Sequence, residues 1–132
     1  MTSRIASCSC GQLRIACEGE PLRISICHCL ECQKRTGSVF AVQARFASDR
    51  VKPEGRASHW SRKGDSGGSA TFRFCPDCAA IVYWTPDGGD FVMVAVGAFA
   101  DPNFPPPFVS VYEERQHPWT RALSDLPLEH HS

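Results

Sequence analysis

Hydrophobic and polar residues alternate along much of this chain with a period of two, which is typical of half-buried β-strands. In the segment 12–17, for example, Leu13, Ile15 and Cys17 share one face. Glycines and prolines separate the alternating runs and predict turns, as at 19–21, 53–55 and 86–89. The other predicted strands are 22–26, 40–46, 72–74, 81–84, 91–96 and 109–113.

The longest apolar run, residues 91–100, is ten residues long and is interpreted as a buried strand. It is too short to span a bilayer. Because 91–96 is apolar on both faces, we expect this strand to be central in its sheet. Only 30–36 has a helical pattern, of about two turns, and Gly37 is expected to end it.

Polar and proline-rich stretches mark the expected loops. The Gly- and Ser-rich segment 62–69 predicts a polar loop, and three consecutive prolines within 101–107 exclude a strand ladder there. The segment 124–132 has little pattern, and we expect a loosely ordered tail. The prediction is therefore a single domain over 1–132, mostly β, with several short antiparallel strands and one short helix.

Length and charge narrow the functional classes. The chain has 132 residues, which fits one domain, and 14 Lys and Arg residues balance 14 Asp and Glu residues. A net charge of zero excludes a strongly basic nucleic-acid binder, so no nucleic-acid partner is expected. Residues 1–73 carry 12 basic and 6 acidic side chains, whereas residues 74–132 carry 2 and 8. This asymmetry indicates either attraction within one domain or a basic rim that draws a small anion.

The N-terminal residues lack the apolar core of a secretory signal, so we expect a cytoplasmic location, where thiols stay reduced. The eight cysteines then indicate metal or thiol chemistry rather than disulfides. Seven of them lie in three clusters: Cys8 and Cys10; Cys27, Cys29 and Cys32; and Cys75 and Cys78. Such spacing aims thiolates at one point, as tetrahedral zinc requires. A redox-active pair is the competing interpretation of the third cluster, but the βαβ pattern usual for it is missing.

The clustered cysteines divide into a set of four and a set of three. The cluster within 27–32 can converge from one segment, which leaves the pairs 8/10 and 75/78 to join across the fold. Four sulfurs close a structural site, whereas three leave a fourth position open, as in catalytic zinc sites. A rival partition combines 29/32 with 75/78 in one zinc ribbon and leaves the other cysteines unligated.

The motifs also carry a family resemblance. In order, the chain contains Cys-x-Cys-Gly, Gly-Glu-Pro, Cys-His-Cys-x-x-Cys-x-x-x-Thr-Gly-Ser, Phe-Cys-Pro-x-Cys and Val-Tyr-Trp. This pattern runs from residue 8 to 84, resumes at 114–119, and resembles the glutathione-dependent formaldehyde-activating (GFA) family, whose superfamily includes centromere protein V. The chain departs from it at Ala79, where the family usually has a glycine that permits positive φ.

The resemblance implies a zinc-bearing β-tent with two zinc ions per chain. It assigns a structural zinc to Cys8, Cys10, Cys75 and Cys78, and the active-site zinc to Cys27, Cys29 and Cys32. The implied reaction adds glutathione to formaldehyde, giving S-hydroxymethylglutathione. The reverse step breaks a carbon–sulfur bond, so such proteins are carbon–sulfur lyases.

Thiolate ligands limit what an open zinc site can do. Three thiolates give the zinc complex a formal charge of −1 and lower its Lewis acidity, which disfavours hydrolysis and suits a substrate thiol as the fourth ligand. The expected partners are a small thiol and an aldehyde, without a membrane, and a homo-oligomer stays open. The alternatives are a non-catalytic zinc-stabilised binding module and a thiol redox sensor.

The resemblance also makes Thr36, Gly37, Ser38 and His117 candidates for the substrate pocket, although a helix end explains Gly37 equally well. The guanidinium groups of Arg35, Arg45 and Arg115 could pair with glutathione carboxylates or could be solvated at the surface.

Four further side chains have structural interpretations. Trp84 and Trp119 are predicted core residues or pocket walls, and Cys17 is a predicted core residue. His28 lies between two ligands, so its ring should point away from the metal, with a proton shuttle as the alternative.

Overall fold

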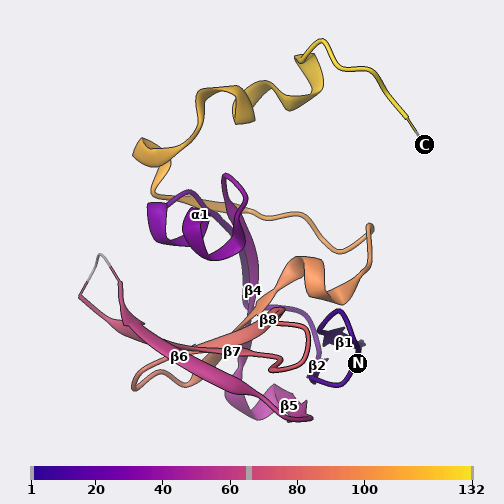
Figure 1. Ribbon diagram of the computed structural model, residues 1–132, viewed down its shortest axis with the longest axis vertical. Helices are drawn as coiled ribbons and strands as arrows, with labels where there is room; N and C mark the ends of the chain where they lie inside the picture. Colours follow the sequence, from indigo (N-terminus) through magenta and orange to yellow (C-terminus); the bar gives the residue numbers. More distant parts are fainter. Residues whose placement is uncertain (1, 65–66, 132) are drawn as a thin grey trace.

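The computed structural model describes residues 2–64 and 67–131. In this part of the chain the strands are β1 (Ser3–Ser7), β2 (Arg14–Glu18), β3 (Arg23–Cys27), β4 (Ala41–Ala47), β5 (Val51–Glu54), β6 (Ser58–Lys63), β7 (Ser69–Phe74), β8 (Ile81–Pro86), β9 (Phe91–Ala95) and β10 (Val109–Val111). They form a seven-stranded sheet in the order β10-β3-β4-β9-β8-β7-β6 and a three-stranded sheet in the order β1-β2-β5 (Figure 1). The mostly β prediction is confirmed.

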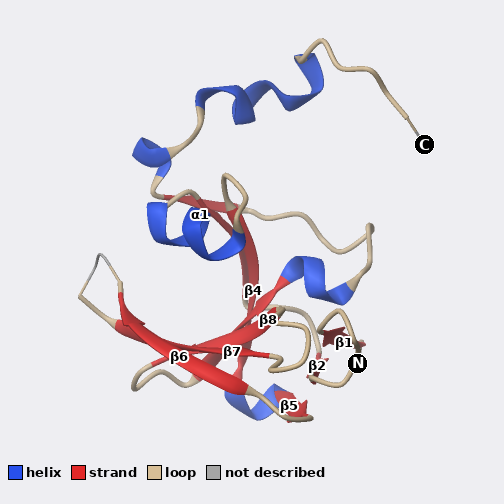
Figure 2. Ribbon diagram, viewed as in Figure 1, coloured by secondary structure: helices blue, strands red, loops and turns tan. Residues whose placement is uncertain are grey.

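The predicted helix is also confirmed. Helix α1 spans Leu30–Thr36, and Gly37 follows it with φ of 71°. The Gly37 N–H donates to the Gln33 carbonyl at 2.9 Å, which closes the last turn. The other helical segments are 3₁₀ turns (Figure 2).

Strand β9 is the central strand of the larger sheet, between β4 and β8, as its two apolar faces predict. The apolar run 91–100 is not one strand, however. Beyond Ala95 it turns into a 3₁₀ segment, Val96–Phe99, and Ala100 adopts a left-handed conformation with φ of 52°. The ring of Phe99 thereby stacks on Phe104 in the main core, with ring centres 4.7 Å apart.

Three strands were missed because each lies at a sheet edge. β1, β5 and β6 each pair with one neighbour only, so little of their surface is buried and their apolar alternation is weak. Strand β6 is mostly exposed and carries the sequence SHWSRK. Strands β6 and β7 also take up both ends of the predicted loop 62–69, of which residues 65–66 lie outside the described part of the chain.

One strand pair departs from the antiparallel prediction. Strand β10 runs parallel to β3, with Val111 opposite Cys27. The proline-rich segment before β10 makes the long connection that a parallel pair requires, and the Phe108 N–H joins the Ile24 carbonyl at 3.0 Å. The C-terminal part of the chain is thus carried to the edge of β3, beside the cysteine cluster at its end.

The main core lies between the two sheets. It combines residues of β2, such as Ile15 and Cys17, with Phe46 and Val94 of the larger sheet. A second cluster, formed by Phe72, Trp84 and Met93, lies across neighbouring strands β7, β8 and β9.

The C-terminal segment continues as 3₁₀ turns at Glu113–Arg115 and Pro118–Asp125. In Figure 1 it passes α1 and extends away from the sheets. Ser124 and Asp125 belong to the last 3₁₀ turn, and no regular structure follows within the described residues. The single-domain boundary and the loosely ordered tail over 124–132 stay predictions. Among the described residues, no helix has the length and apolar character needed to cross a membrane.

Candidate metal centres and substrate pocket

Four cysteines meet where the turn after β1 approaches the turn between β7 and β8. The sulfurs of Cys8, Cys10, Cys75 and Cys78 all lie within 4.8 Å of one another. The Cys10 sulfur is 3.6 Å from that of Cys8 and 3.7 Å from that of Cys75. A zinc–sulfur distance of about 2.3 Å gives a tetrahedral edge of about 3.8 Å, and all four thiols are free. The group therefore fits a closed zinc site.

Hydrogen-bond donors surround this group. The Gln12 side-chain amide donates to the Cys75 sulfur at 2.9 Å, and the Asp77 backbone N–H lies 3.4 Å from it. Burial alone would raise the pKa of Cys75, but these donors and the Cys78 backbone N–H lower it to about 6. The Leu13 backbone N–H acts similarly on Cys8, whose pKa is also lowered against the effect of burial. Both thiolates are favoured before any metal binds.

Ala79 follows this site in a left-handed conformation, with φ of 68°. Its N–H donates to the Cys75 carbonyl at 2.8 Å and closes the turn. The turn therefore has the positive φ that the glycine of the GFA pattern permits, and alanine adopts it at a cost of about 1–2 kcal/mol.

Three further cysteines, here called the triad, meet at the junction of β3 and α1. Cys27 ends β3, Cys29 caps α1 with its sulfur 3.2 Å from the Cys32 backbone N–H, and Cys32 lies in the first turn. All three sulfurs lie within 4.8 Å of one another, and all three residues are buried. Cys29 and Cys32 belong to a different group from Cys75 and Cys78, so the structure does not bring together the four ligands of the rival zinc ribbon.

The triad thiols differ in acidity. The Cys27 thiol donates to Cys32 and lowers the pKa of Cys32 to about 5, against the effect of burial, and the Arg35 guanidinium 3.6 Å away acts in the same direction. The pKa of Cys27 is raised for the converse reason, with burial adding to it. Burial likewise raises the pKa of Cys29.

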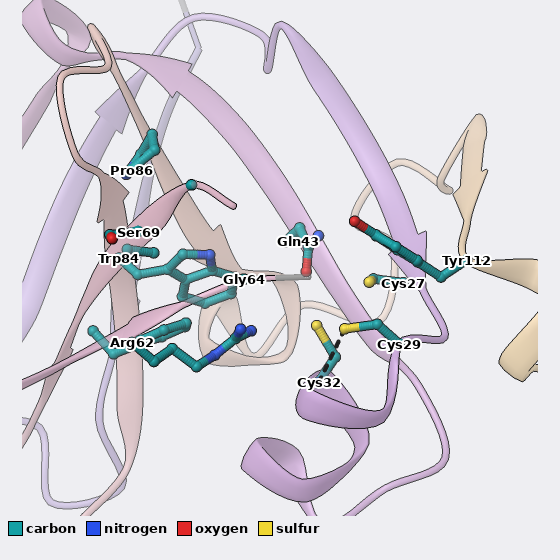
Figure 3. Close-up of a pocket in the computed structure, with 13 residues that line it drawn as sticks. Cys27, Cys29, Cys32, Gln43, Arg62, Gly64, Ser69, Trp84, Pro86 and Tyr112 are labelled. Carbon is teal, nitrogen blue, oxygen red and sulfur yellow. Dashed lines mark hydrogen bonds between the residues drawn. The ribbon is translucent and has the colours of Figure 1, made fainter. Parts of the chain in front are cut away.

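A cavity of about 260 Å³ opens in front of the triad, and all three cysteines line it (Figure 3). The opposite wall comes from β7 and β8, including Phe72 and Trp84. A metal held by the three sulfurs would therefore have its fourth position on the cavity side. This is the arrangement of an open, exchangeable site rather than a closed structural one.

Two arginines lie over the aromatic wall. The Arg35 guanidinium is 4.2 Å from the Trp84 ring centre and 5.0 Å from that of Phe72, and the Arg62 guanidinium is 5.3 Å from the Phe72 ring centre. Arg62 lines the cavity, and the Nε atoms of both arginines are buried without a hydrogen-bond partner among the residues that the structure describes. Within the described residues neither guanidinium has an acidic partner in an ion pair. This wall is positively charged and suits an anionic ligand.

The predicted pocket residues Thr36, Gly37, Ser38 and His117 lie beside the triad rather than on the cavity wall. Thr36 and Gly37 bond back to α1, and the Ser38 N–H joins the Thr36 hydroxyl at 3.1 Å. His117 Nε2 donates to the Gln33 side chain at 3.0 Å. Their substrate-binding roles stay predictions.

The other predicted residues divide between the cavity, the core and the surface. Of the three arginines, only Arg35 contacts the triad; Arg45 stacks on Phe91, and Arg115 lies in an exposed 3₁₀ turn. Trp84 is buried on the cavity wall, whereas Trp119 is 43% exposed and does not line the cavity.

Both His28 and Cys17 are buried side chains. The His28 ring packs edge-on against Phe40 and does not line the cavity, and its Nδ1 is buried without a partner in the described part of the chain. Cys17 is fully buried in the main core, which raises its pKa to about 12. It is a core residue, as predicted.

Sequence reasoning missed four residues of these sites: Gln12, Gln43, Arg62 and Tyr112. Gln12 directly follows the first cysteine turn, which is a signal that could have been used. The other three reach the cavity from β4, β6 and the end of β10, far from the cysteines in sequence. Only the sheet order brings them together.

Comparison with known proteins agrees with this description. The family model of the glutathione-dependent formaldehyde-activating enzyme matches residues 3–115. A crystal structure of a Rhodobacter sphaeroides protein has a similar fold, with a TM-score of 0.59 and 17% sequence identity over 80% of this chain and 98% of that chain. No protein with a curated description matches the sequence. Since the family model covers most of the chain, this protein belongs to the glutathione-dependent formaldehyde-activating (GFA) family.

Proposed function

We propose that this protein is a zinc-dependent enzyme that adds a thiol to an aldehyde and reversibly cleaves the carbon–sulfur bond, with glutathione and formaldehyde as substrates. The observation that carries the proposal is that the three triad cysteines line an open cavity. The other four cysteines form a complete set of four sulfurs and do not line this cavity. Zinc on the triad would supply a Lewis-acid position that favours the thiolate of an incoming thiol.

The chain's own residues favour this chemistry. The buried triad excludes bulk water from one side of the reacting sulfur, and Arg35 offsets part of the negative charge of the thiolates. The aromatic wall supplies an apolar surface for the carbon chain of the thiol.

The charge of the cavity supports a thiol that carries carboxylates. Arg62 and Arg35 lie over Phe72, and among the described residues neither has a carboxylate partner in an ion pair, so this wall is positively charged and suits an anionic ligand, although Arg35 also contacts the Cys32 sulfur. Glutathione has two carboxylates and fits this class. A cytoplasmic location, where thiols are reduced, is part of the proposal.

The proposal is tested by exchange NMR spectroscopy of glutathione with formaldehyde. The zinc-loaded protein should accelerate exchange between free and hydroxymethylated glutathione, and Cys29→Ser should remove the acceleration. Cys17→Ala, a thiol change in the core away from the cavity, is the matched control and should retain it. An unchanged exchange rate with the wild-type protein would overturn this substrate pair.

Measurement of bound zinc on the same samples addresses the alternatives. A second zinc that stays firmly bound and is indifferent to glutathione would favour a zinc-stabilised binding module. Release of that zinc by mild peroxide, without acceleration of exchange, would favour a redox sensor.

A further inference from the structure

We infer that Gln43 and Tyr112 form a binding site for the oxygen atom of the aldehyde, which becomes the hydroxyl of the hydroxymethyl product. The inference rests on the proposed function, and it adds the group that discriminates an S–CH₂–OH ligand from a thiol or a thioether.

Gln43 is a buried polar side chain whose amide oxygen lacks a partner among the described residues. It is 8% exposed, and its Oε1 makes no hydrogen bond with any residue that the structure describes. Buried polar groups in folded proteins are nearly always paired, and leaving one unpaired is costly. An orphaned amide oxygen on a cavity wall therefore indicates that a ligand supplies the missing donor.

The sheet register aims Gln43 at the triad. Ser25 pairs with Gln43 and Cys27 pairs with Ala41, so Gln43 and Cys27 lie on the same face as diagonal neighbours on adjacent strands. In Figure 3 the oxygen of the Gln43 amide points toward the space in front of the three sulfurs. A group bonded to a sulfur in that space would meet this oxygen.

Tyr112 enters the same cavity from the C-terminal side. It follows β10, whose last residue, Val111, pairs with Cys27. The His28 N–H bonds to the Val111 carbonyl at 3.1 Å, and the Arg115 N–H bonds to the Tyr112 carbonyl at 3.0 Å. These bonds hold the backbone beside the triad, and the Tyr112 ring lines the cavity with its hydroxyl directed inward (Figure 3).

The backbone of Tyr112 is strained in holding this position. Its φ is 56°, in the left-handed region that bulky residues rarely adopt. Such strain persists where the surrounding structure enforces it, and it concentrates at ligand-binding positions. This conformation turns the chain from β10 into the 3₁₀ turn Glu113–Arg115, at the point where Tyr112 lines the cavity.

The two side chains match the hydrogen-bonding capacity of a hydroxyl group. In the addition, the thiol sulfur bonds to the carbonyl carbon, the π electrons of the carbonyl move to its oxygen, and the thiol proton ends on that oxygen. The resulting hydroxyl can donate one hydrogen bond through its O–H and can accept hydrogen bonds through the lone pairs of its oxygen. The Tyr112 hydroxyl donates to the oxygen as its negative charge develops, and Gln43 Oε1 accepts a hydrogen bond from the hydroxyl once the proton has reached that oxygen.

The test combines Gln43→Met, which keeps the length of the side chain and removes its polar end, with Tyr112→Phe. In exchange NMR at saturating glutathione, we expect the formaldehyde-dependent rate to fall about tenfold in the first variant, which loses an acceptor for the hydroxyl, and about 100-fold in the second, which loses the donor to the developing negative charge. Glutathione affinity, measured by calorimetry on the zinc-loaded protein, should stay within about twofold, because the thiol site is intact. Gln116→Met, away from the cavity, is the matched control and should behave as the wild type.

A readout independent of activity separates a binding role from a structural one. Because Oε1 of Gln43 is unpaired in the free protein, Gln43→Met should raise the midpoint of thermal unfolding, whereas a structural glutamine would lower it. Full exchange activity in Gln43→Met, or a lowered midpoint, would overturn the assignment while leaving the proposed function intact. An inactive wild-type protein would overturn both.

Discussion

At the scale of single residues, the groups that surround each cysteine determine the pKa and the role of its thiol. Cys17 is enclosed by apolar neighbours and its pKa is raised to about 12, so it packs as a hydrophobic side chain. Cys75 is also buried, but the donors around it lower its pKa to about 6. The same residue type serves as core or as ligand according to the donors within reach.

Ala79 offers a direct test of the turn that closes the four-cysteine site. Ala79→Gly should stabilise the zinc-loaded protein by about 1 kcal/mol, because glycine adopts the φ of 68° without the steric cost. The measurement is chemical denaturation. Ala57 is exposed and does not have a positive φ, so the control variant Ala57→Gly should instead be neutral or destabilising. A variant at 79 that is less stable than the wild type would contradict this explanation.

The triad should bind zinc with a steep pH dependence. In the metal-free protein at neutral pH, Cys32 is the thiolate, whereas the raised pKa values of Cys27 and Cys29 keep those thiols protonated. Binding therefore displaces about two protons, and the affinity for the second zinc equivalent should fall about 100-fold for a decrease of one pH unit. Competition with a chelator between about pH 6.5 and 7.5 measures this. An affinity independent of pH would contradict the assigned protonation states.

At the scale of elements, sequence reasoning worked best where the signal is local. Strand β9, helix α1 and its end at Gly37 are set by neighbouring residues and were predicted. The parallel pairing of β10 with β3 was not, because it depends on contacts across more than 80 residues of sequence. The cavity likewise combines residues of five separate strands, so the cysteine groups could be predicted but the wall facing the triad could not.

Gln33 joins α1 to the C-terminal segment. Its amide donates to the carbonyls of His28 and Arg115 at 2.9 and 3.1 Å, and its oxygen accepts from His117. Gln33→Ala removes two hydrogen bonds to the C-terminal segment and should lower hydrogen-exchange protection in residues 113–121 about 30-fold, since each lost bond is worth about 1 kcal/mol. Lys34→Ala, an exposed change on the same helix, is the control and should leave that protection unchanged. Equal protection in both variants would show that other contacts hold the segment.

At the scale of the whole molecule, the two cysteine sites differ in how much of the fold they connect. The four-cysteine site ties the turn after β1 in the smaller sheet to the turn between β7 and β8, far apart in sequence. The triad lies within six residues and closes only a short loop. Long closures constrain the unfolded chain more than short ones.

Cys8→Ser should therefore destabilise the zinc-loaded protein by more than about 3 kcal/mol. Cys29→Ser should cost much less, and serine at this position can still cap α1 through its hydroxyl. Thermal unfolding of the two variants makes the comparison. A cost for Cys29→Ser as large as that for Cys8→Ser would mean that the triad, too, is a structural site.

The uneven distribution of charge between residues 1–73 and 74–132 is also a property of the whole molecule. Of the ion pairs between described residues, only Arg56–Asp77 joins the basic residues of 1–73 to the acidic residues of 74–132. Arg62 instead lines the cavity and Arg35 lies over the Trp84 ring of its wall, which favours the interpretation of a basic rim that draws an anion.

The central claim is that the triad holds a zinc ion with a position open to a thiol, and native mass spectrometry tests it most directly. The wild-type protein should carry about two zinc ions per chain and should bind one glutathione when it is added. Cys29→Ser should retain the zinc of the four-cysteine site and lose the glutathione. Two zinc ions without a bound thiol, or glutathione binding that survives Cys29→Ser, would contradict the account.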